Sequence, residues 1–197
     1  MVLSVSTLGD MQENSDRTAI IAAAKELFYA RGYAGVGMDD IRDAAGISLR
    51  RLYREFPSKE SVVLGVLGEL HEDWEAGVQA AVAAENDPTD RVLAIYDYLA
   101  DWFATDDFRG CGFINAFAEL GANSAAVAEI ARTHKASFQR YVGELVSDAG
   151  GTPRLASQLA ILAEGAQTTA AIAGTVDAAA DARDAALTLI GAGTVDR

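Results

Sequence analysis

The stretch that decides the fold covers residues 38–56 and reads MDDIRDAAGISLRRLYREF. Two short helical patterns flank Gly46, and glycine tolerates the left-handed backbone that a tight turn between helices requires. Asp39 and Asp40 stand in the first turn of the first pattern, where the positive end of the helix dipole favours carboxylates. Ser48 is placed to cap the second helix with its hydroxyl. Two helices joined by such a turn predict a helix-turn-helix motif.

The second of these helices carries three arginines, and an arginine can donate two hydrogen bonds to guanine or pair with phosphate. Four apolar residues would hold the motif together and leave its other face open to a DNA groove: Ile41, Ala45, Ile47 and Leu52. The predicted DNA-contacting residues are Arg42, Ser48, Leu49, Arg50, Arg51, Tyr53, Arg54 and Lys59. Among these we expect Arg50 or Arg51 to read a base, and Tyr53 and Lys59 to bind phosphates.

The charge of the chain is unevenly distributed. The formal net charge is -13, yet residues 1–60 hold eight Lys/Arg and nine Asp/Glu, whereas residues 61–197 hold eight and twenty. Between residues 47 and 59, four cations stand against Glu55 alone, a local excess of +3. Charges farther away than a Debye length of about 8 Å are largely screened at physiological salt. A local cationic patch can therefore bind DNA although the chain as a whole is acidic.

The cysteine count and the lengths of the apolar runs argue against several classes of protein. Cys111 is the only cysteine, so neither an intrachain disulfide nor a cysteine-based zinc site is possible. No apolar run approaches the roughly 18 residues of a membrane span, and the first fifteen residues do not read as a signal peptide. These features predict a cytoplasmic protein without a membrane partner.

Helical periodicity continues through the rest of the chain, and no strand alternation interrupts it. We expect an all-α fold of about nine helices. A loose arm over residues 1–14 precedes a first helix that begins at Ser15 or Asp16 and ends at Gly32. Later helices are expected over about 59–84, 88–104, 111–120, from 123 or 124 to the break at 150–153, and over about 154–173 and 178–190. The predicted domains are 15–60, with the helix-turn-helix at about 37–56, and 61–197.

At this point residues 17–67 resemble the DNA-binding domain of TetR-type transcriptional regulators. The resemblance rests on Ala23–Phe28, Arg31–Tyr33, Asp40–Ile41, Ala45–Ser48, Leu52–Tyr53 and Phe56–Glu60, in this order and spacing. Residues 110–115, GCGFIN, resemble a stretch often found early in the regulatory domain. Two positions depart from the family pattern: Gly37 stands where Ser or Thr often caps the second helix, and Arg42 stands where Ala is common.

The resemblance implies a dimer on a near-palindromic operator, usually a repressor that a small ligand releases. In this family the last two helices usually form the dimer interface, and here they are rich in Ala, Gly and Thr. An effector site would be largely apolar with a few polar groups. The candidate ligand-binding residues are Trp74, Tyr96, Trp102, Phe103, Phe113, Asn115, Phe117, Phe138, Tyr141 and Gln167, with Glu119 and His134 as further polar groups. Each of these residues is also compatible with an ordinary core or surface role.

Other chemistry has little support in the sequence. His71 and His134 are the only histidines, no Glu-x-x-His pair occurs, and no nucleophile elbow is present. We therefore expect no metal, no cofactor and no catalytic residue. The leading interpretation is a ligand-responsive repressor. A helical protein that binds or sequesters a small molecule without DNA function is the alternative, and an all-α enzyme is a third.

Overall fold

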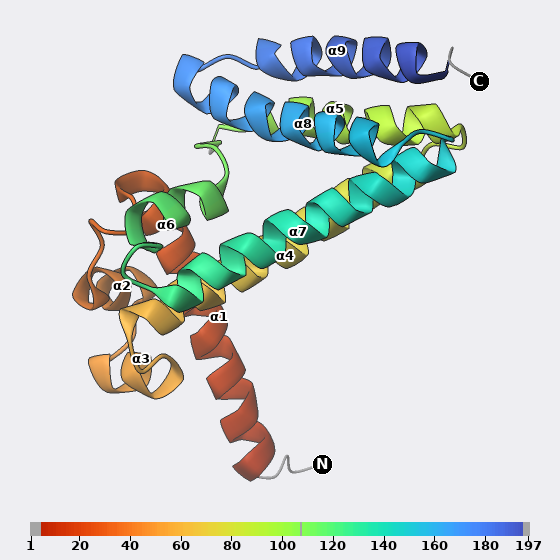
Figure 1. Ribbon diagram of the computed structural model, residues 1–197. Coiled ribbons are helices and arrows are strands. Elements are labelled where there is room, and N and C mark those ends of the chain that lie inside the picture. The colour runs from red at the N-terminus through yellow and green to blue at the C-terminus, as the bar shows by residue number, and fades with distance from the viewer. Residues whose placement is uncertain (1–4, 107, 195–197) are drawn as a thin grey trace. The chain divides into compact units, whose positions relative to one another are not determined.

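A computed structural model describes the backbone of residues 5–106 and 108–194, and the side chains of residues 15–106 and 108–192. Within these ranges it contains nine helices and no strand (Figure 1), which confirms the expected all-α fold. The helices are α1 (Val5–Arg31), α2 (Met38–Ala45), α3 (Leu49–Glu55), α4 (Lys59–Ala83), α5 (Pro88–Phe103), α6 (Gly112–Leu120), α7 (Ala125–Asp148), α8 (Pro153–Ala173) and α9 (Asp177–Thr194).

The start of the first helix differs from the expectation. We expected α1 to begin at Ser15 or Asp16, but the structure begins it at Val5, so residues 5–14 are helical rather than a loose arm. Residues 1–4 lie outside the described residues. The expectation followed the apolar period, which marks where a helix packs. A helix can extend beyond its packed part wherever helix propensity is adequate. No proline stands before Pro57, so none interrupts the helix over residues 5–14.

The chain divides into two compact units. Unit 1 contains the residues up to Leu70 together with Gly112–Ala131, and unit 2 contains His71–Cys111 and the residues from Arg132 onward. Helices α4 and α7 therefore each contribute one segment to either unit. The functional boundary at residue 60 stays a prediction, because the compact units are divided elsewhere along the chain.

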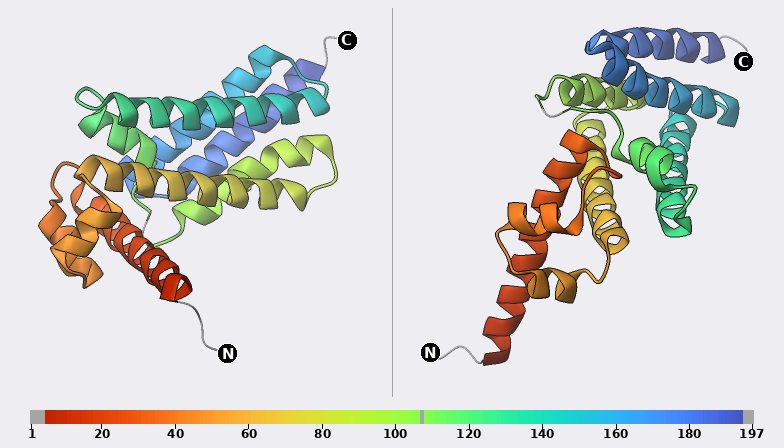
Figure 2. Two further views of the ribbon diagram at one scale, coloured as in Figure 1. Left: turned by 90° about the horizontal axis from the view of Figure 1, so that it is seen from below. Right: turned by 90° about the vertical axis from the view of Figure 1, so that its left-hand side faces the viewer.

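The core of unit 1 follows directly from the apolar pattern of the sequence. Ile20, Ala24 and Phe28 are buried along one face of α1, as their helical spacing predicts. Helix α1 packs against α2 and α3 (Figure 2). It ends where Gly32 takes a φ of 76°, the left-handed conformation that favours glycine after a helix.

In unit 2, helices α5, α8 and α9 pack on one another. Small residues allow this close approach, since Ala160, Ala163 and Ala186 are almost completely buried. Tyr96 of α5 is buried among them, and its hydroxyl donates to the Leu159 carbonyl at 2.8 Å. Among the described helices, none combines the length and the apolar character that crossing a membrane requires.

Candidate nucleic-acid interface

The turn between α2 and α3 has the geometry that the sequence predicts. Gly46 takes a φ of 65° in the left-handed region, and Ser48 caps α3 by accepting the Arg51 backbone N–H at 3.3 Å. Ile41 and Leu52 are completely buried and anchor α2 and α3 in the core of unit 1. The anchored side of α3 therefore fixes which side chains its opposite side presents.

Helix α2 begins without a side-chain cap, because Gly37 has no side chain to supply one. Asp40 compensates from the third position of the helix, where its carboxylate accepts the Gly37 N–H at 2.8 Å. This backbone hydrogen bond, assisted by Arg31 at 3.2 Å, lowers the pKa of Asp40 below its ordinary value. The departure from Ser or Thr at position 37 thus removes the side-chain cap, while the hydrogen bond from the Gly37 N–H to Asp40 remains.

Arg42, the second departure, lies along the surface of α2. Its guanidinium pairs with Asp39 at 2.6 Å and with Asp43 at 2.7 Å, and its side chain is 30% exposed. The hydrogen bond from Arg42 to Asp43 raises the pKa of the guanidinium. Because two carboxylates already neutralise it, Arg42 has less charge to offer a phosphate than the sequence suggested.

The outward side of α3 presents Leu49, Arg50 and Tyr53, which are all exposed. Arg50 forms no hydrogen bond or ion pair with any residue that the structure describes. Leu49 is 39% exposed and Tyr53 is 46% exposed, whereas Leu52 of the same helix is fully buried. Ser48 and Arg54, which are also predicted to contact DNA, are exposed as well.

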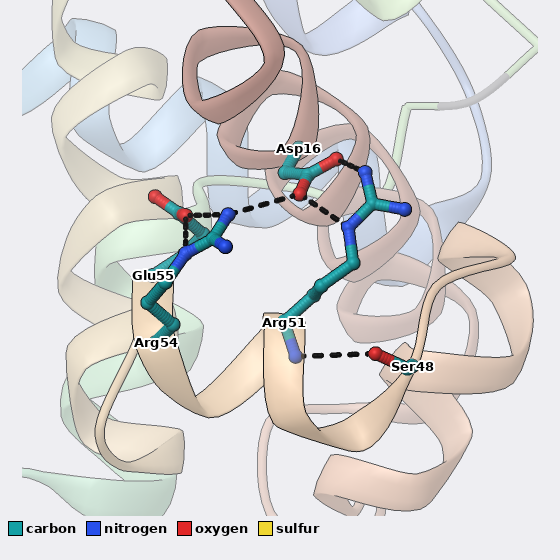
Figure 3. Close-up of polar contacts among 5 residues, drawn as sticks. All are labelled: Asp16, Ser48, Arg51, Arg54 and Glu55. Atoms are coloured by element: carbon teal, nitrogen blue, oxygen red, sulfur yellow. Dashed lines mark hydrogen bonds and ion pairs between the residues drawn. The ribbon is translucent and has the colours of Figure 1, made fainter. Parts of the chain in front are cut away.

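The other two arginines of α3 turn toward α1 (Figure 3). Arg51 forms a two-pronged ion pair with Asp16, with its Nε 2.6 Å from Oδ2 and its Nη2 on Oδ1. The Arg54 Nη2 lies 3.3 Å from the same Oδ2, and Arg54 also pairs with Glu55 at 2.9 Å. Asp16 thus places an anion beside the cations of residues 47–59, whose own excess of +3 is unchanged.

Lys59 is also engaged within unit 1. Its Nζ donates to the Ala34 carbonyl at 3.2 Å, while the Ala34 N–H donates to the Glu119 carboxylate at 2.7 Å. The turn after α1 is therefore tied to the start of α4 and to α6. Glu119, considered as a ligand-orienting group, holds a backbone N–H of unit 1 instead.

Asp16 is the residue of this interface that the sequence analysis missed, since it was considered only as a possible helix cap. A signal was present: Asp16 stands four residues before Ile20, which stands four before Ala24, so the carboxylate continues the buried stripe of α1. An acidic residue on a buried stripe requires a cationic partner, because an isolated buried charge is too costly. The partner itself, 35 residues away, was not visible in the sequence.

Comparisons with known proteins agree with this geometry. Residues 20–66 match the family model described as bacterial regulatory proteins, tetR family. A TetR-family transcriptional regulator from Streptomyces coelicolor superposes with a TM-score of 0.86 at 25% identity, over 91% of this chain and 96% of that one. Residues 20–66 therefore carry a domain of the tetR family, and the chain shares the fold of TetR-family regulators. A second TetR regulator, from Chloroflexus aurantiacus, gives a TM-score of 0.80 at 25% identity, over 92% and 96% of the two chains.

Two curated relatives are named for opposite effects on transcription, one as an activator and one as a repressor. The transcriptional activator FasR of Mycolicibacterium smegmatis is 36% identical over 46% of this chain and 41% of its own length. The transcriptional repressor ComR of Escherichia coli is 29% identical over 64% of this chain and 60% of its own length. The chain therefore matches between two-fifths and three-fifths of these relatives.

Unit 2 contains a cavity of about 170 Å³ between side chains of α4 and α7. Three of the predicted aromatic ligand-binding residues line it, Trp74, Phe138 and Tyr141, together with the further polar candidate His134. Its lining is more polar than expected, since these aromatics are joined by His71, Glu75, Gln79, His134, Ser137, Arg140 and Glu144. The aromatic residues were visible in the helical periodicity, whereas the polar ones come together only because two distant helix segments meet.

A pair of histidines lies in this cavity. The Nδ1 atoms of His71 and His134 are 3.0 Å apart, which requires one ring to donate and the other to accept. Burial is the main cause that lowers the pKa of His134 to about 3, with Lys135 and His71 adding to the effect. His134 is therefore neutral at physiological pH. No group of three or more possible metal ligands occurs among the side chains that the structure describes.

The remaining predicted ligand-binding residues lie outside this cavity. Phe103 lines a second cavity, of about 220 Å³, with Phe108, Arg109 and residues of the end of α8. Tyr96 and Gln167 are buried in the core of unit 2 with hydrogen bonds of their own, and Trp102 packs on Trp74. Phe113, Asn115 and Phe117 belong to α6 in unit 1. Of these seven residues, Phe103 alone lines one of the two cavities.

Proposed function

We propose that this chain is a transcriptional regulator that binds a near-palindromic DNA operator as a homodimer, represses transcription and is released by a small molecule. One observation carries the proposal. Helix α3, in the segment that matches the family model, is anchored by Leu52 and presents Leu49, Arg50 and Tyr53 to solvent. An exposed arginine on an anchored helix is the element with which helix-turn-helix proteins read base edges in the major groove.

The proposed roles divide among the cations of unit 1. Arg50 reads a base, because its guanidinium is exposed and engages no described residue. Tyr53 donates its hydroxyl to a phosphate, and the N–H groups at the start of α4, beside Lys59, offer a second phosphate site. Arg42, Arg51 and Arg54 are paired with carboxylates, and we expect them to contribute phosphate contacts rather than base contacts.

The dimer would form through the exposed faces of α8 and α9. Ile161 and Ile172 of α8 are 68% and 83% exposed, and Leu187 of α9 is 47% exposed. Gly165 lies between the two isoleucines on the same face of α8, so another helix could approach closely there. Such a two-fold dimer would place its reading helices roughly 34–36 Å apart, one turn of DNA. Changing Ile161 and Ile172 together to Asp should yield a monomer in sedimentation experiments.

The effector site would be the cavity lined by Trp74, Phe138 and Tyr141. Its polar lining favours a small molecule that carries hydrogen-bonding groups as well as an apolar part. Helix α4 is continuous from Lys59 to Ala83, so a ligand that contacts His71 and Trp74 acts on the helix whose first turns belong to unit 1. The ligand would shift α4 between two states and change DNA affinity.

Selection of bound duplexes from a random pool tests the proposal directly. We expect a palindromic sequence, with affinity that falls steeply as salt rises because phosphate contacts release counterions. A reporter gene behind that sequence would then give the sign of regulation. If the folded chain binds no duplex even in dilute salt, the proposal is wrong. The alternative, a sequestering protein, would then be tested by ligand binding that quenches the fluorescence of Trp74 and Trp102.

The proposal includes no catalytic step, no metal and no cofactor beyond the effector, and these expectations remain predictions. A regulator of transcription acts where the chromosome is, so the cytoplasmic location expected from the sequence is part of the same proposal. The expectation of no catalytic step would be wrong if the purified chain turned over a substrate. The expected location would be wrong if the chain acted outside the cell.

A further inference from the structure

Among the side chains that the structure describes in unit 1, Asp16 is the buried charged one, with only 2% of its surface exposed. Its carboxylate is held by the Nε and Nη2 of Arg51 and by the Nη2 of Arg54, at 3.3 Å in the latter case (Figure 3). Asp16 belongs to α1, whereas both arginines belong to the proposed reading helix α3. A carboxylate outside the reading helix therefore contacts two of its three guanidiniums, while Glu55 also holds that of Arg54.

The order of residues along α3 explains why Arg50 escapes this carboxylate. Successive residues of a helix are separated by about 100°, so Arg50 and Arg51 lie on different flanks. The Arg51 flank faces α1, and its side chain reaches Asp16. The Arg50 flank is exposed, and its guanidinium forms no hydrogen bond or ion pair with a described residue. Arg54 lies four positions after Arg50 and is drawn away from that flank by Asp16 and by Glu55 at 2.9 Å.

A guanidinium that reads guanine must present two N–H groups to one base edge. The edge of Arg51 formed by Nε and Nη2 is occupied by Asp16, and the same edge of Arg54 is occupied by Glu55 at 3.0 and 2.9 Å. The N–H groups that remain can still donate to a phosphate, which accepts from many directions.

We propose that Asp16 is a positioning residue that sets the selectivity of α3. It holds Arg51 and Arg54 against α1 and restricts them to phosphate contacts, so that Arg50 is the arginine that reads a base. This inference rests on the proposed DNA-binding function. It adds that the selectivity depends on a residue of α1, outside the helix-turn-helix.

Removal of the carboxylate should then increase DNA affinity and decrease selectivity. In Asp16→Asn one negative charge beside α3 is removed, so that the Arg51 guanidinium is released toward the phosphate backbone, whereas Arg54 keeps its pair with Glu55. One additional phosphate contact makes the slope of log K against log salt steeper by about 0.9. At 0.1 M salt we expect roughly 3- to 10-fold tighter binding to a scrambled duplex, and a similar decrease in the ratio of operator to scrambled affinity.

The experiment measures fluorescence anisotropy of the full chain with the selected operator and with a scrambled duplex of equal length. Glu26→Gln is the matched control, because Glu26 is an exposed carboxylate of the same helix and the change in net charge is the same. The double variant Asp16→Asn/Arg51→Gln also removes the Arg51 cation that Asp16→Asn releases. We expect it to return the scrambled-duplex affinity toward the wild-type value, and we expect Glu26→Gln to leave the affinity ratio unchanged.

Arg50→Gln and Arg51→Gln decide the proposal even if Asp16→Asn fails to fold. We expect Arg50→Gln to relax the selected base at one position of each half-site. Arg51→Gln should weaken both duplexes alike and leave the selected bases unchanged. The inference is overturned if Arg51→Gln relaxes a base position, because Asp16 would then support Arg51 as the base reader. It is also overturned if folded Asp16→Asn behaves like Glu26→Gln. A wild-type chain that binds no duplex would instead refute the proposed function.

Discussion

The two units bury polar groups in different ways. In the described part of the chain, unit 1 buries the carboxylate of Asp16, whereas unit 2 buries His134 and Gln167, which are both uncharged at neutral pH. Asp16 is stabilised by ion pairs with two arginines of another helix. His134 shares a hydrogen bond with His71, and the Gln167 amide donates to the Ala163 carbonyl at 3.4 Å.

This difference separates what each unit depends on. A buried charge needs an opposite charge, so the packing of α1 on α3 in unit 1 is linked to the same arginines that the DNA would meet. Buried neutral groups need only one good hydrogen bond each, so unit 2 can place polar atoms around a cavity without a compensating charge. Unit 1 should therefore respond to salt and charge mutations, and unit 2 to protonation.

Protonation of His134 should have the largest effect. Its folded pKa of about 3 lies below the ordinary value of 6.5, so between these values the unfolded chain binds a proton that the folded chain does not. Stability is then complete above pH 6.5 and falls as the pH decreases toward 3, by up to about 4–5 kcal/mol at roughly 1.4 kcal/mol per pKa unit.

Urea unfolding of the wild type and of His134→Gln between pH 7 and pH 3.5 measures this contribution. Carboxylates titrate in both proteins, so the difference between the two curves isolates the histidine. We expect the variant to lose less stability on acidification. Parallel curves would show that the buried imidazole is not held neutral by unit 2.

Arg51→Ala comes second and would disrupt the buried charge of unit 1. It leaves the Asp16 carboxylate with Arg54 as its remaining α3 partner, and breaking a buried pair costs about 3–5 kcal/mol. Because the Arg51 side chain is 38% exposed, we expect about 2–3 kcal/mol at pH 7. Arg50→Ala is the matched control, since it removes the same charge from an exposed neighbour and should stay within about 0.5 kcal/mol. Equal losses in thermal unfolding would contradict the role of Asp16.

Tyr96→Phe tests a neutral buried hydrogen bond in unit 2. The substitution removes the hydroxyl that donates to the Leu159 carbonyl and should cost about 1 kcal/mol. Burial raises the pKa of Tyr96, so the hydroxyl stays protonated at acidic and neutral pH. Tyr98→Phe is the control, because the half-buried Tyr98 hydroxyl makes no hydrogen bond to a described residue. Denaturant midpoints that shift equally for both variants would remove the distinction.

Asp40→Asn should have the smallest effect, at the start of α2. The Gly37 N–H and Arg31 lower the pKa of Asp40, so its contribution is present above the ordinary value of 3.8 and is lost as the pH falls below it. We therefore expect a small decrease in melting temperature at pH 7 that disappears near pH 3. Asp39→Asn removes a charge from the same turn without breaking the bond to Gly37. A decrease that persists at pH 3 would exclude the carboxylate as its cause.

Much of the fold was predictable because local signals are strong in this chain. Gly32 and Gly46 mark helix ends through their backbone conformation, Ser48 caps α3, and the helix boundaries expected beyond residue 58 agree with the structure to within a few residues. The start of α1 was not predictable in this way, because residues 5–14 continue a helix without the apolar period that was taken as its signal. The lining of the cavity between α4 and α7 was only partly predictable, since periodicity identifies aromatic faces but not most of the polar side chains that face them.

The sequence by itself determined that this is a helical chain with a helix-turn-helix near residues 38–56, because turns, caps and apolar spacing act between residues a few positions apart. Tertiary structure alone decided which arginine is available to DNA. Arg50 and Arg51 are neighbours with the same chemistry, and only the packing of α1 brings Asp16 to one of them and not to the other. Electrostatic partners are selected by distance in space, which a local pattern does not encode.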